Sequence, residues 1–124
     1  MLKSERIVWA AAMVATGITC WAMGQDRKLV DPSMNILLEN DRVRAQEHFV
    51  KVGQTIPMHS HPAKVIYALN DWRVRETLAD GTARIVEGKA GTARWGKATQ
   101  HAIENIGTTE VRNIVVELKG PCGE

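Results

Sequence analysis

The sequence predicts an all-β domain, closed into a barrel or sandwich and preceded by a hydrophobic leader. Helix signals are nearly absent after residue 24, β-rich runs recur, and turn residues separate these runs at intervals of roughly 8 to 12 positions. Short connections favour antiparallel pairing of neighbouring strands. Closing about eight or nine short strands into a double-sheet barrel protects the sheet edges.

Each predicted strand is bounded by residues that interrupt strands. The β-rich runs cover residues 35–38, 43–52, 64–69, 72–78, 82–86, 92–95, 101–106 and 111–118. Gly, Pro, Asn or Asp follows them at 40–41, 53, 70–71, 80–81, 88, 91, 107 and 120–121. Asp80-Gly81 lies between two runs, and this dipeptide is typical of a tight β-hairpin.

The first 24 residues have the three-part pattern of a secretory signal peptide. Basic residues lie within residues 1–6, residues 7–23 carry no charge, and Ala22 and Gly24 place small side chains before a cleavage point. We therefore expect export, to the periplasm or medium, with cleavage after Gly24. The alternatives are an uncleaved membrane anchor, for which about 17 apolar positions are marginal, and a buried helix.

The expected organisation is a signal peptide or anchor at 1–24, a lead-in segment at 25–36, a β-barrel at 37–119 and a tail at 120–124. Cleavage would leave Cys122 as the single cysteine, so the domain must depend on its core rather than on an internal disulfide. The formal net charge is +2. The leader carries two basic residues and one acidic residue, so its removal leaves about +1. This interleaved, near-neutral balance predicts no nucleic-acid partner.

Three of the four histidines lie in a pattern that suggests a metal site. His59 and His61 are two positions apart, and His101 follows some forty positions later. Side chains at i and i+2 of a strand point to the same face. Neutral imidazole is a common ligand of divalent metals. A third histidine from a neighbouring strand would complete a three-nitrogen site with open coordination positions.

These residues resemble the two motifs of the cupin superfamily. The first motif, G-x5-H-x-H-x3,4-E-x6-G, is similar to Gly53, His59 and His61 at the correct spacing. The second motif ends in H-x3-N, which is similar to His101 and Asn105. The resemblance covers about residues 37–119. It departs from the pattern at the glutamate, since positions 65 and 66 are Val and Ile, and at the closing glycine.

The resemblance implies a double-stranded β-helix, or jelly-roll barrel, and a homodimer is a mild expectation from it. Without the motif glutamate, the ligand set would be His59, His61 and His101 alone. This pattern resembles cupin dioxygenases that act on thiols or diketones, whereas other cupins with degraded motifs bind no metal.

We expect a divalent ion, with Fe(II) favoured and Zn, Ni, Mn or Cu as alternatives. With no carboxylate ligand, three neutral imidazoles leave the charge of the ion uncompensated, which favours a small anionic chelating ligand. The leading hypothesis is an exported mononuclear non-haem dioxygenase-type enzyme. The alternatives are a non-catalytic metal or small-ligand binding module, and an isomerase or hydrolase with a redox-inert ion. No membrane partner is expected beyond the N-terminal anchor.

Several other polar residues are candidates for roles near this site. Each metal-bound histidine should donate its second ring nitrogen to a partner. The candidate partners are Gln46, Glu47, Glu104 and Asn105, with a turn-capping role favoured for Asn105.

The remaining assignments concern side chains of the strands. His48 is interpreted as an exposed strand histidine. Lys64 and Arg75 are interpreted as solvated, with attraction of an anionic ligand as the alternative. Tyr67 and Trp95 are expected in the core, because few other large side chains can fill it.

Overall fold

The computed structural model describes residues 34–120. The hydrophobic leader at 1–24, most of the lead-in segment and Cys122 lie outside the described residues. Within residues 34–120, no helix is long and apolar enough to cross a membrane.

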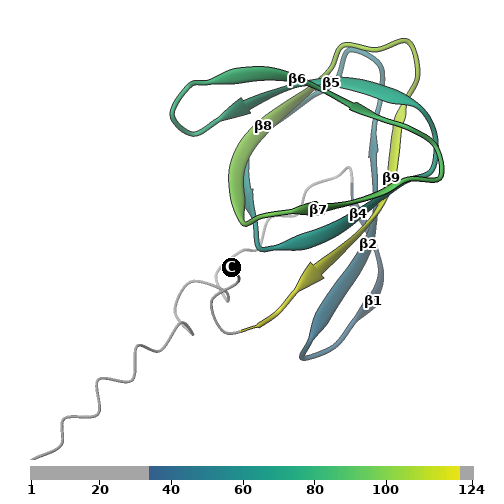
Figure 1. The fold of residues 1–124 in the computed structure, drawn as a ribbon, viewed down its shortest axis with the longest axis vertical. Helices are drawn as coiled ribbons and strands as arrows, with labels where there is room; N and C mark the ends of the chain where they lie inside the picture. Colours follow the sequence, from purple (N-terminus) through teal and green to yellow (C-terminus); the bar gives the residue numbers. More distant parts are fainter. Residues whose placement is uncertain (1–33, 121–124) are drawn as a thin grey trace, which may run out of the picture.

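The described residues form nine β-strands, which confirms the all-β prediction (Figure 1). One strand contains both histidines of the first motif. The strands are β1 (Met34–Glu39), β2 (Val43–Val50), β3 (Thr55–His61), β4 (Lys64–Ala68), β5 (Trp72–Leu78), β6 (Ala83–Gly88), β7 (Ala93–Gly96), β8 (Thr99–Asn105) and β9 (Val111–Leu118).

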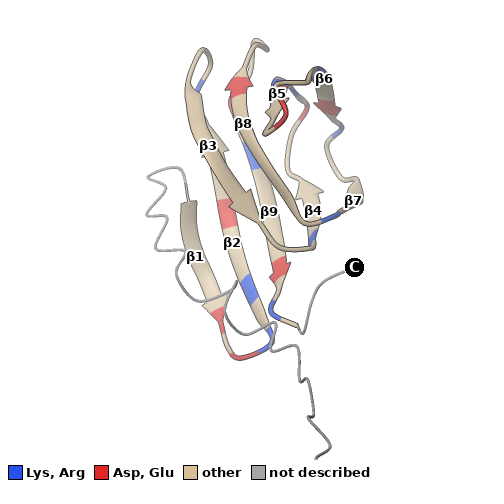
Figure 2. Cartoon of the chain, turned by 90° about the vertical axis from the view of Figure 1, so that its left-hand side faces the viewer, with Lys and Arg blue, Asp and Glu red and all other residues tan. Residues whose placement is uncertain are grey.

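The strands form two antiparallel sheets that face each other. The five-stranded sheet has the order β1-β2-β9-β4-β7, and the four-stranded sheet has the order β3-β8-β5-β6. After β2, the chain passes from one sheet to the other at nearly every connection, and only β5 and β6 are successive strands of one sheet. Figure 1 shows the resulting roll, in which strands distant in sequence enclose a common interior. Basic and acidic residues are interspersed over the strands in Figure 2.

The hairpin predicted at Asp80-Gly81 connects β5 to β6. The Asp80 side chain accepts a hydrogen bond of 2.8 Å from the backbone N–H of Thr82. Gly81 has a φ of 86°, a conformation that is unfavourable for residues with a Cβ atom. These two residues therefore fix the turn, and the turn fixes the register of β5 against β6.

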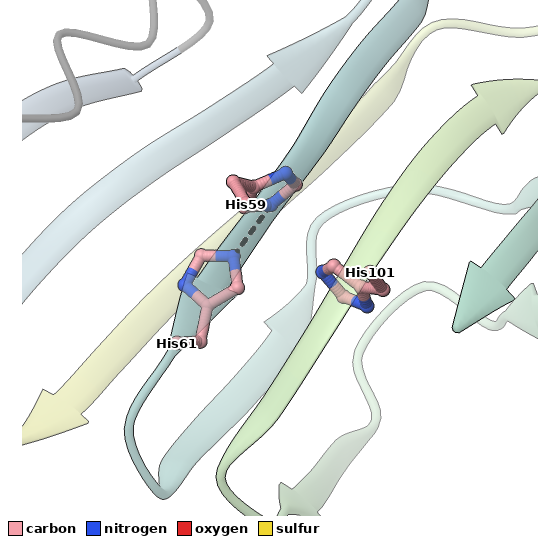
Figure 3. Close-up of side chains that lie close together, drawn as sticks. All are labelled: His59, His61 and His101. Carbon is pink, nitrogen blue, oxygen red and sulfur yellow. Dashed lines mark hydrogen bonds between the residues drawn. The ribbon is translucent and has the colours of Figure 1, made fainter. Parts of the chain in front are cut away.

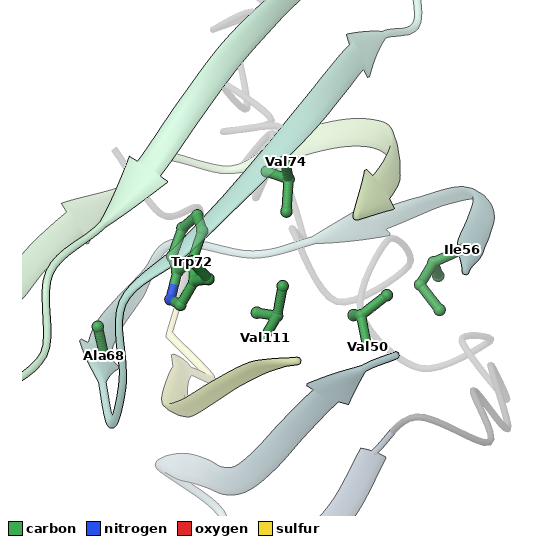
Figure 4. Packing of buried hydrophobic residues seen from close by; sticks show 6 residues of the cluster. All are labelled: Val50, Ile56, Ala68, Trp72, Val74 and Val111. Atoms are coloured by element: carbon green, nitrogen blue, oxygen red, sulfur yellow. The ribbon is translucent and has the colours of Figure 1, made fainter. Parts of the chain in front are cut away.

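An apolar cluster packs inside the roll (Figure 4). Val86 and Ile103 pack against it from the side. Trp72 is its largest member, and the Trp72 indole N–H donates a hydrogen bond of 2.8 Å to Asn113 Oδ1. The cluster consists of Val50, Ile56, Ala68, Trp72, Val74 and Val111.

The interior also contains buried polar side chains. Burial of polar groups is unfavourable unless they find partners, so such a cluster calls for an explanation. The burial of Asn105 is explained by its hydrogen bonds. Its side-chain amide donates to the carbonyl oxygens of Val50 and Thr109, and its Oδ1 accepts from the backbone N–H of Gly107. The buried polar side chains are those of Gln46, His61, Lys64, Glu76, His101, Asn105, Asn113 and Glu117.

Two expected core residues are in fact exposed. Tyr67 is 42% exposed and Trp95 is 53% exposed, so this expectation was wrong. In β4, Lys64 and Ala68 are buried, and strand alternation places Tyr67 on the outer face. Trp95 pairs with Val65 on that same face.

Candidate metal centre

The three histidines of the predicted site meet inside the roll. His59 and His61 lie on β3, and His101 lies directly opposite His59 on the neighbouring strand β8. One ring nitrogen from each residue can be chosen so that all three lie within 4.8 Å of one another. Figure 3 shows the three rings converging on a common point. The structure therefore brings together all three residues that the sequence proposed.

A β-bulge gives His59 and His61 their inward direction. Ile56 pairs with Ile103 and His59 pairs with His101, so β3 contains one residue more than β8 between these pairs. Unbroken alternation from the buried Ile56 would direct positions 57, 59 and 61 outward. The extra residue shifts the alternation. The bulge also leaves the carbonyl oxygen of Pro57 2.7 Å from His59 Nδ1, as a hydrogen-bond acceptor.

Two carboxylates hold the other two rings. His61 Nδ1 lies 2.6 Å from Glu117 Oε1 on β9, and His101 Nδ1 lies 2.6 Å from Glu76 Oε1 on β5. In each pair the ring N–H donates to the carboxylate, an arrangement that orients metal-binding histidines. Sequence analysis did not propose either glutamate, because both are distant in sequence from the histidines they contact.

None of the four residues proposed as hydrogen-bond partners of the metal-binding histidines is seen in that role. Glu47 pairs with Arg112 and Glu104 pairs with Arg75, since strand alternation turns both carboxylates outward. Asn105 holds a turn, which confirms the favoured interpretation. Gln46 is buried, and its Nε2 has no hydrogen-bond partner among the described residues.

The hydrogen bonds assign one proton to Nδ1 of each ring and leave a lone pair on each Nε2. His59 Nε2 and His61 Nε2 lie only 2.9 Å apart (Figure 3). Two lone pairs at this separation repel unless a cation, either a proton or a metal ion, lies between them. Two imidazole nitrogens about 2.1 Å from one ion lie about 3 Å apart when they occupy neighbouring octahedral positions. The side-chain arrangement therefore fits a divalent metal.

The protonation states also favour metal binding. Burial lowers the pKa of His61, so its ring is neutral near pH 7. Burial alone would raise the pKa of Glu117, but the hydrogen bond from His61 and the charge interactions with His61, Arg44 and His48 together lower this pKa. The hydrogen bond from His101 lowers the pKa of Glu76 to about 2. Both carboxylates are thus ionised near pH 7.

Glu76 and Glu117 change the expectation about the charge around a bound ion. The sequence suggested that the charge of an ion would be uncompensated, because the motif glutamate is missing. Glu76 and Glu117 place two negative charges one hydrogen bond away from the imidazoles. Their charge can offset that of a divalent ion without occupying its coordination positions.

A cavity of about 80 Å³ adjoins the imidazoles. Ile66 lines it, at the position where the family motif places its glutamate, whereas Val65 is exposed on the outer face. Lys64 also lines the cavity and is buried, so the interpretation of Lys64 as solvated was wrong. Arg75 is exposed and paired with Glu104, as a solvated strand residue should be.

His48 also belongs to this interior. It lines the same cavity, and its ring centroid lies 5.6 Å from that of His61. The interpretation of His48 as an exposed histidine was wrong, because β2 turns Glu47 outward and His48 inward. The cavity thus brings all four histidines of the chain near one another.

No family model matches the sequence, and no curated protein matches it. Solved structures match it at the level of the fold. A cupin domain from Bordetella pertussis superposes with a TM-score of 0.64 at 18% identity, and the match covers 70% of this chain and 92% of that chain. The chain has the cupin fold. This confirms the resemblance seen at Gly53, His59, His61 and His101.

Two further structures support the cupin fold. A conserved protein with a double-stranded β-helix domain from Klebsiella pneumoniae matches with a TM-score of 0.57 at 20% identity, over 73% of this chain and 78% of that chain. The polyketide cyclase RemF from Streptomyces resistomycificus matches with a TM-score of 0.54 at 22% identity, over 70% of this chain and 64% of that chain. Together, the cupin fold and the three-histidine cluster fit a divalent metal site.

Proposed function

We propose that the protein binds one divalent metal ion through Nε2 of His59, His61 and His101, and holds a small chelating ligand beside it. The observation that carries this proposal is the 2.9 Å separation of His59 Nε2 and His61 Nε2, whose rings donate their Nδ1–H groups to other acceptors. Such an arrangement is unfavourable in the absence of a cation. The two ionised glutamates supply the charge that a divalent ion requires.

The leading chemical role is that of a mononuclear non-haem dioxygenase-type enzyme. A bound Fe(II) ion would supply oxidation of a chelating molecule by dioxygen. The protein's own residues prepare the site. Glu76 and Glu117 fix the tautomers of His101 and His61, and the apolar wall of Val50, Ile56 and Val74 limits access of water to the cavity.

The second candidate is a non-catalytic metal or small-ligand binding module. Ile66 in place of the motif carboxylate favours it, because a ligand that tunes the reactivity of the ion is missing. A redox-inert ion would restrict the chemistry to isomerisation or hydrolysis. An isomerase or hydrolase is therefore the third candidate, and the similarity in fold to a polyketide cyclase is compatible with it.

Metal content tests the first part of the proposal. Protein purified without added metal is analysed for bound elements, next to the His59→Ala/His61→Ala variant. Ser60→Ala is the matched control, because Ser60 lies between the two histidines on the opposite face of β3. We expect about one ion per chain in the wild type and in the control. Equal metal content in the wild type and the double-histidine variant would remove the site from consideration.

Oxygen consumption separates the enzyme from the binding module. Iron-loaded protein is mixed with small thiols and diketones, and dissolved oxygen is followed over time. Consumption that is lost in the His59→Ala/His61→Ala variant supports the dioxygenase. Stoichiometric iron without turnover supports the module.

We also propose that the protein acts after export, with residues 1–24 removed. The support is the charge and hydropathy pattern of the leader. N-terminal sequencing of protein from the periplasm or medium of the producing cell tests this. A chain that begins at Gln25 is the expected result, and an intact N-terminus in the membrane fraction would instead favour the anchor.

We propose, finally, that two copies form a homodimer. The family resemblance suggested it, and the outer face of the five-stranded sheet exposes apolar side chains at Val65, Tyr67 and Trp95 on the adjacent strands β4 and β7. Sedimentation equilibrium measures the mass directly. Trp95→Lys, a change on this face, should shift the mass from two chains to one.

A further inference from the structure

Two cations line the cavity beside the imidazoles. Lys64, on β4, is 4% exposed, and Arg94 lies on the neighbouring strand β7. Within residues 34–120, neither side chain has a carboxylate within ion-pair distance, although ten other ion pairs are formed. Glu117, the cross-strand partner of Lys64, and Glu76 attract the Lys64 ammonium from beyond ion-pair distance, which offsets only part of the cost of burying it. Burial accordingly lowers the pKa of Lys64.

The fold holds both cations in place. Gly96 lies directly opposite Lys64, and a Cβ atom at Gly96 would come within 3.2 Å of Lys64 Cγ. The absence of a side chain at position 96 thus gives the Lys64 stem its space. The Arg94 guanidinium lies 5.0 Å from the centroid of the Trp72 ring, a cation–π contact that orients it.

A second, larger cavity of about 360 Å³ shares Lys64, Arg94 and His101 with the first. Arg84 and Lys97 add two more positive charges to its lining. Its one carboxylate, Glu76, is already bonded to Arg84 and His101. The larger cavity is therefore positively charged, and Lys64 and Arg94 lie where it meets the imidazole cavity.

We propose that Lys64 and Arg94 form an anion subsite that binds the carboxylate of a small organic acid, while a second donor atom of the same molecule reaches the imidazole cluster. The inference rests on the proposed metal site only for this second contact. A carboxylate fits because a guanidinium and an ammonium can each donate to it. It would give Lys64 a direct ion-pair partner, which residues 34–120 do not supply. The inner cavity has room for several waters, which is comparable to the head of a small acid.

Calorimetric titration with glycolate tests the subsite. Glycolate carries a carboxylate next to a hydroxyl group, and glycolamide is its neutral isostere. We expect zinc-loaded protein to bind glycolate at least about ten-fold more tightly than glycolamide, since an anion gains the charge-assisted hydrogen bonds. Lys64→Met and Arg94→Gln should each weaken glycolate binding by a similar factor. Lys64→Arg should restore part of it, and zinc stoichiometry should stay unchanged.

Arg75→Gln is the control, because Arg75 is a cation on the outer face that is paired with Glu104. It should bind glycolate as the wild type does. Equal binding of glycolate and glycolamide, no wild-type binding at millimolar concentrations, or full glycolate affinity in a folded Lys64→Met/Arg94→Gln variant would each overturn the inference. Thermal unfolding of each variant checks that it is folded.

The same titration on metal-free protein separates the two proposals. If zinc does not bind but glycolate binding still depends on Lys64 and Arg94, the metal site fails and the subsite stands. If zinc binds at one ion per chain and the affinity for glycolate does not depend on Lys64 or Arg94, the subsite alone fails.

Discussion

Glu76 and Glu117 reach the same imidazole cluster from opposite sheets. Glu76 comes from β5 of the four-stranded sheet, and Glu117 comes from β9 of the five-stranded sheet. Each accepts a hydrogen bond from an imidazole Nδ1–H, with a nitrogen-to-oxygen distance of 2.6 Å. The cluster is therefore held from two sides by negative charges that do not themselves occupy the ligand positions.

Removing either charge should weaken metal binding. In Glu76→Gln and Glu117→Gln the amide oxygen can still accept the ring N–H, but the negative charge is lost. We expect the metal affinity to fall about 10- to 100-fold in each variant, measured by competition with a chromophoric chelator. Glu104→Gln, which changes an exposed carboxylate on β8, should leave the affinity unchanged. Unaltered affinity in both buried variants would show that the two glutamates only support the fold.

Restoring the missing motif carboxylate should have the opposite effect. Ile66→Glu places a carboxylate in the cavity beside the imidazoles, whereas Val65→Glu places one on the outer face. A fourth, charged ligand should tighten binding of a divalent ion on the order of ten-fold, and the same competition assay measures it. If the two variants bind metal equally, residue 66 does not face the open side of the ion.

Gly88 should not tolerate a side chain. A Cβ atom there would lie 2.1 Å from the Trp72 ring, which belongs to the buried core. Gly88→Ala should therefore lower the free energy of unfolding by about 1–3 kcal/mol, measured by urea denaturation. Gly120→Ala is the control, since its Cβ would meet nothing within 4 Å. Equal stability of the two variants would mean that Trp72 can move aside at little cost.

Asp71 should stabilise the fold in a pH-dependent way. The backbone N–H of Ala90 donates to Asp71 Oδ1 and lowers the pKa of Asp71 below 3.8. A carboxyl group with a depressed pKa in the folded state stabilises it above the unfolded-state pKa, and this contribution is lost as the pH falls through the folded-state value. Asp71→Ala should thus lower the midpoint of thermal unfolding at pH 7. The difference from the wild type should shrink well below pH 3.8, and a constant difference would contradict the assignment.

The cupin fold could be predicted from the sequence because its signals are local. Turn residues such as Asp80-Gly81 and the alternation within strands depend on neighbours in the chain. The three histidines could be predicted because the spacing between them is a motif. The bulge between Ile56 and His59 could not be read from alternation, which by itself would turn His59 outward.

The partners of the imidazoles depend on pairing between distant strands. His61 and Glu117 are separated by 56 positions, and no local pattern connects them. The burial of Lys64 also depends on pairing between strands and so could not be read from a local pattern. A charged residue in a strand is usually solvated, and only the approach of β7 and β9 to β4 shows that this one is enclosed.

The placement of His59, His61 and His101 on β3 and β8 has a consequence for motion. All three belong to the four-stranded sheet, so an ion held by them would not cross-link the two halves of the roll. Two imidazole contacts connect the sheets: the hydrogen bond from His61 to Glu117 and the ring contact between His48 and His61. A displacement of one sheet relative to the other would therefore strain these contacts but leave every metal–nitrogen bond intact.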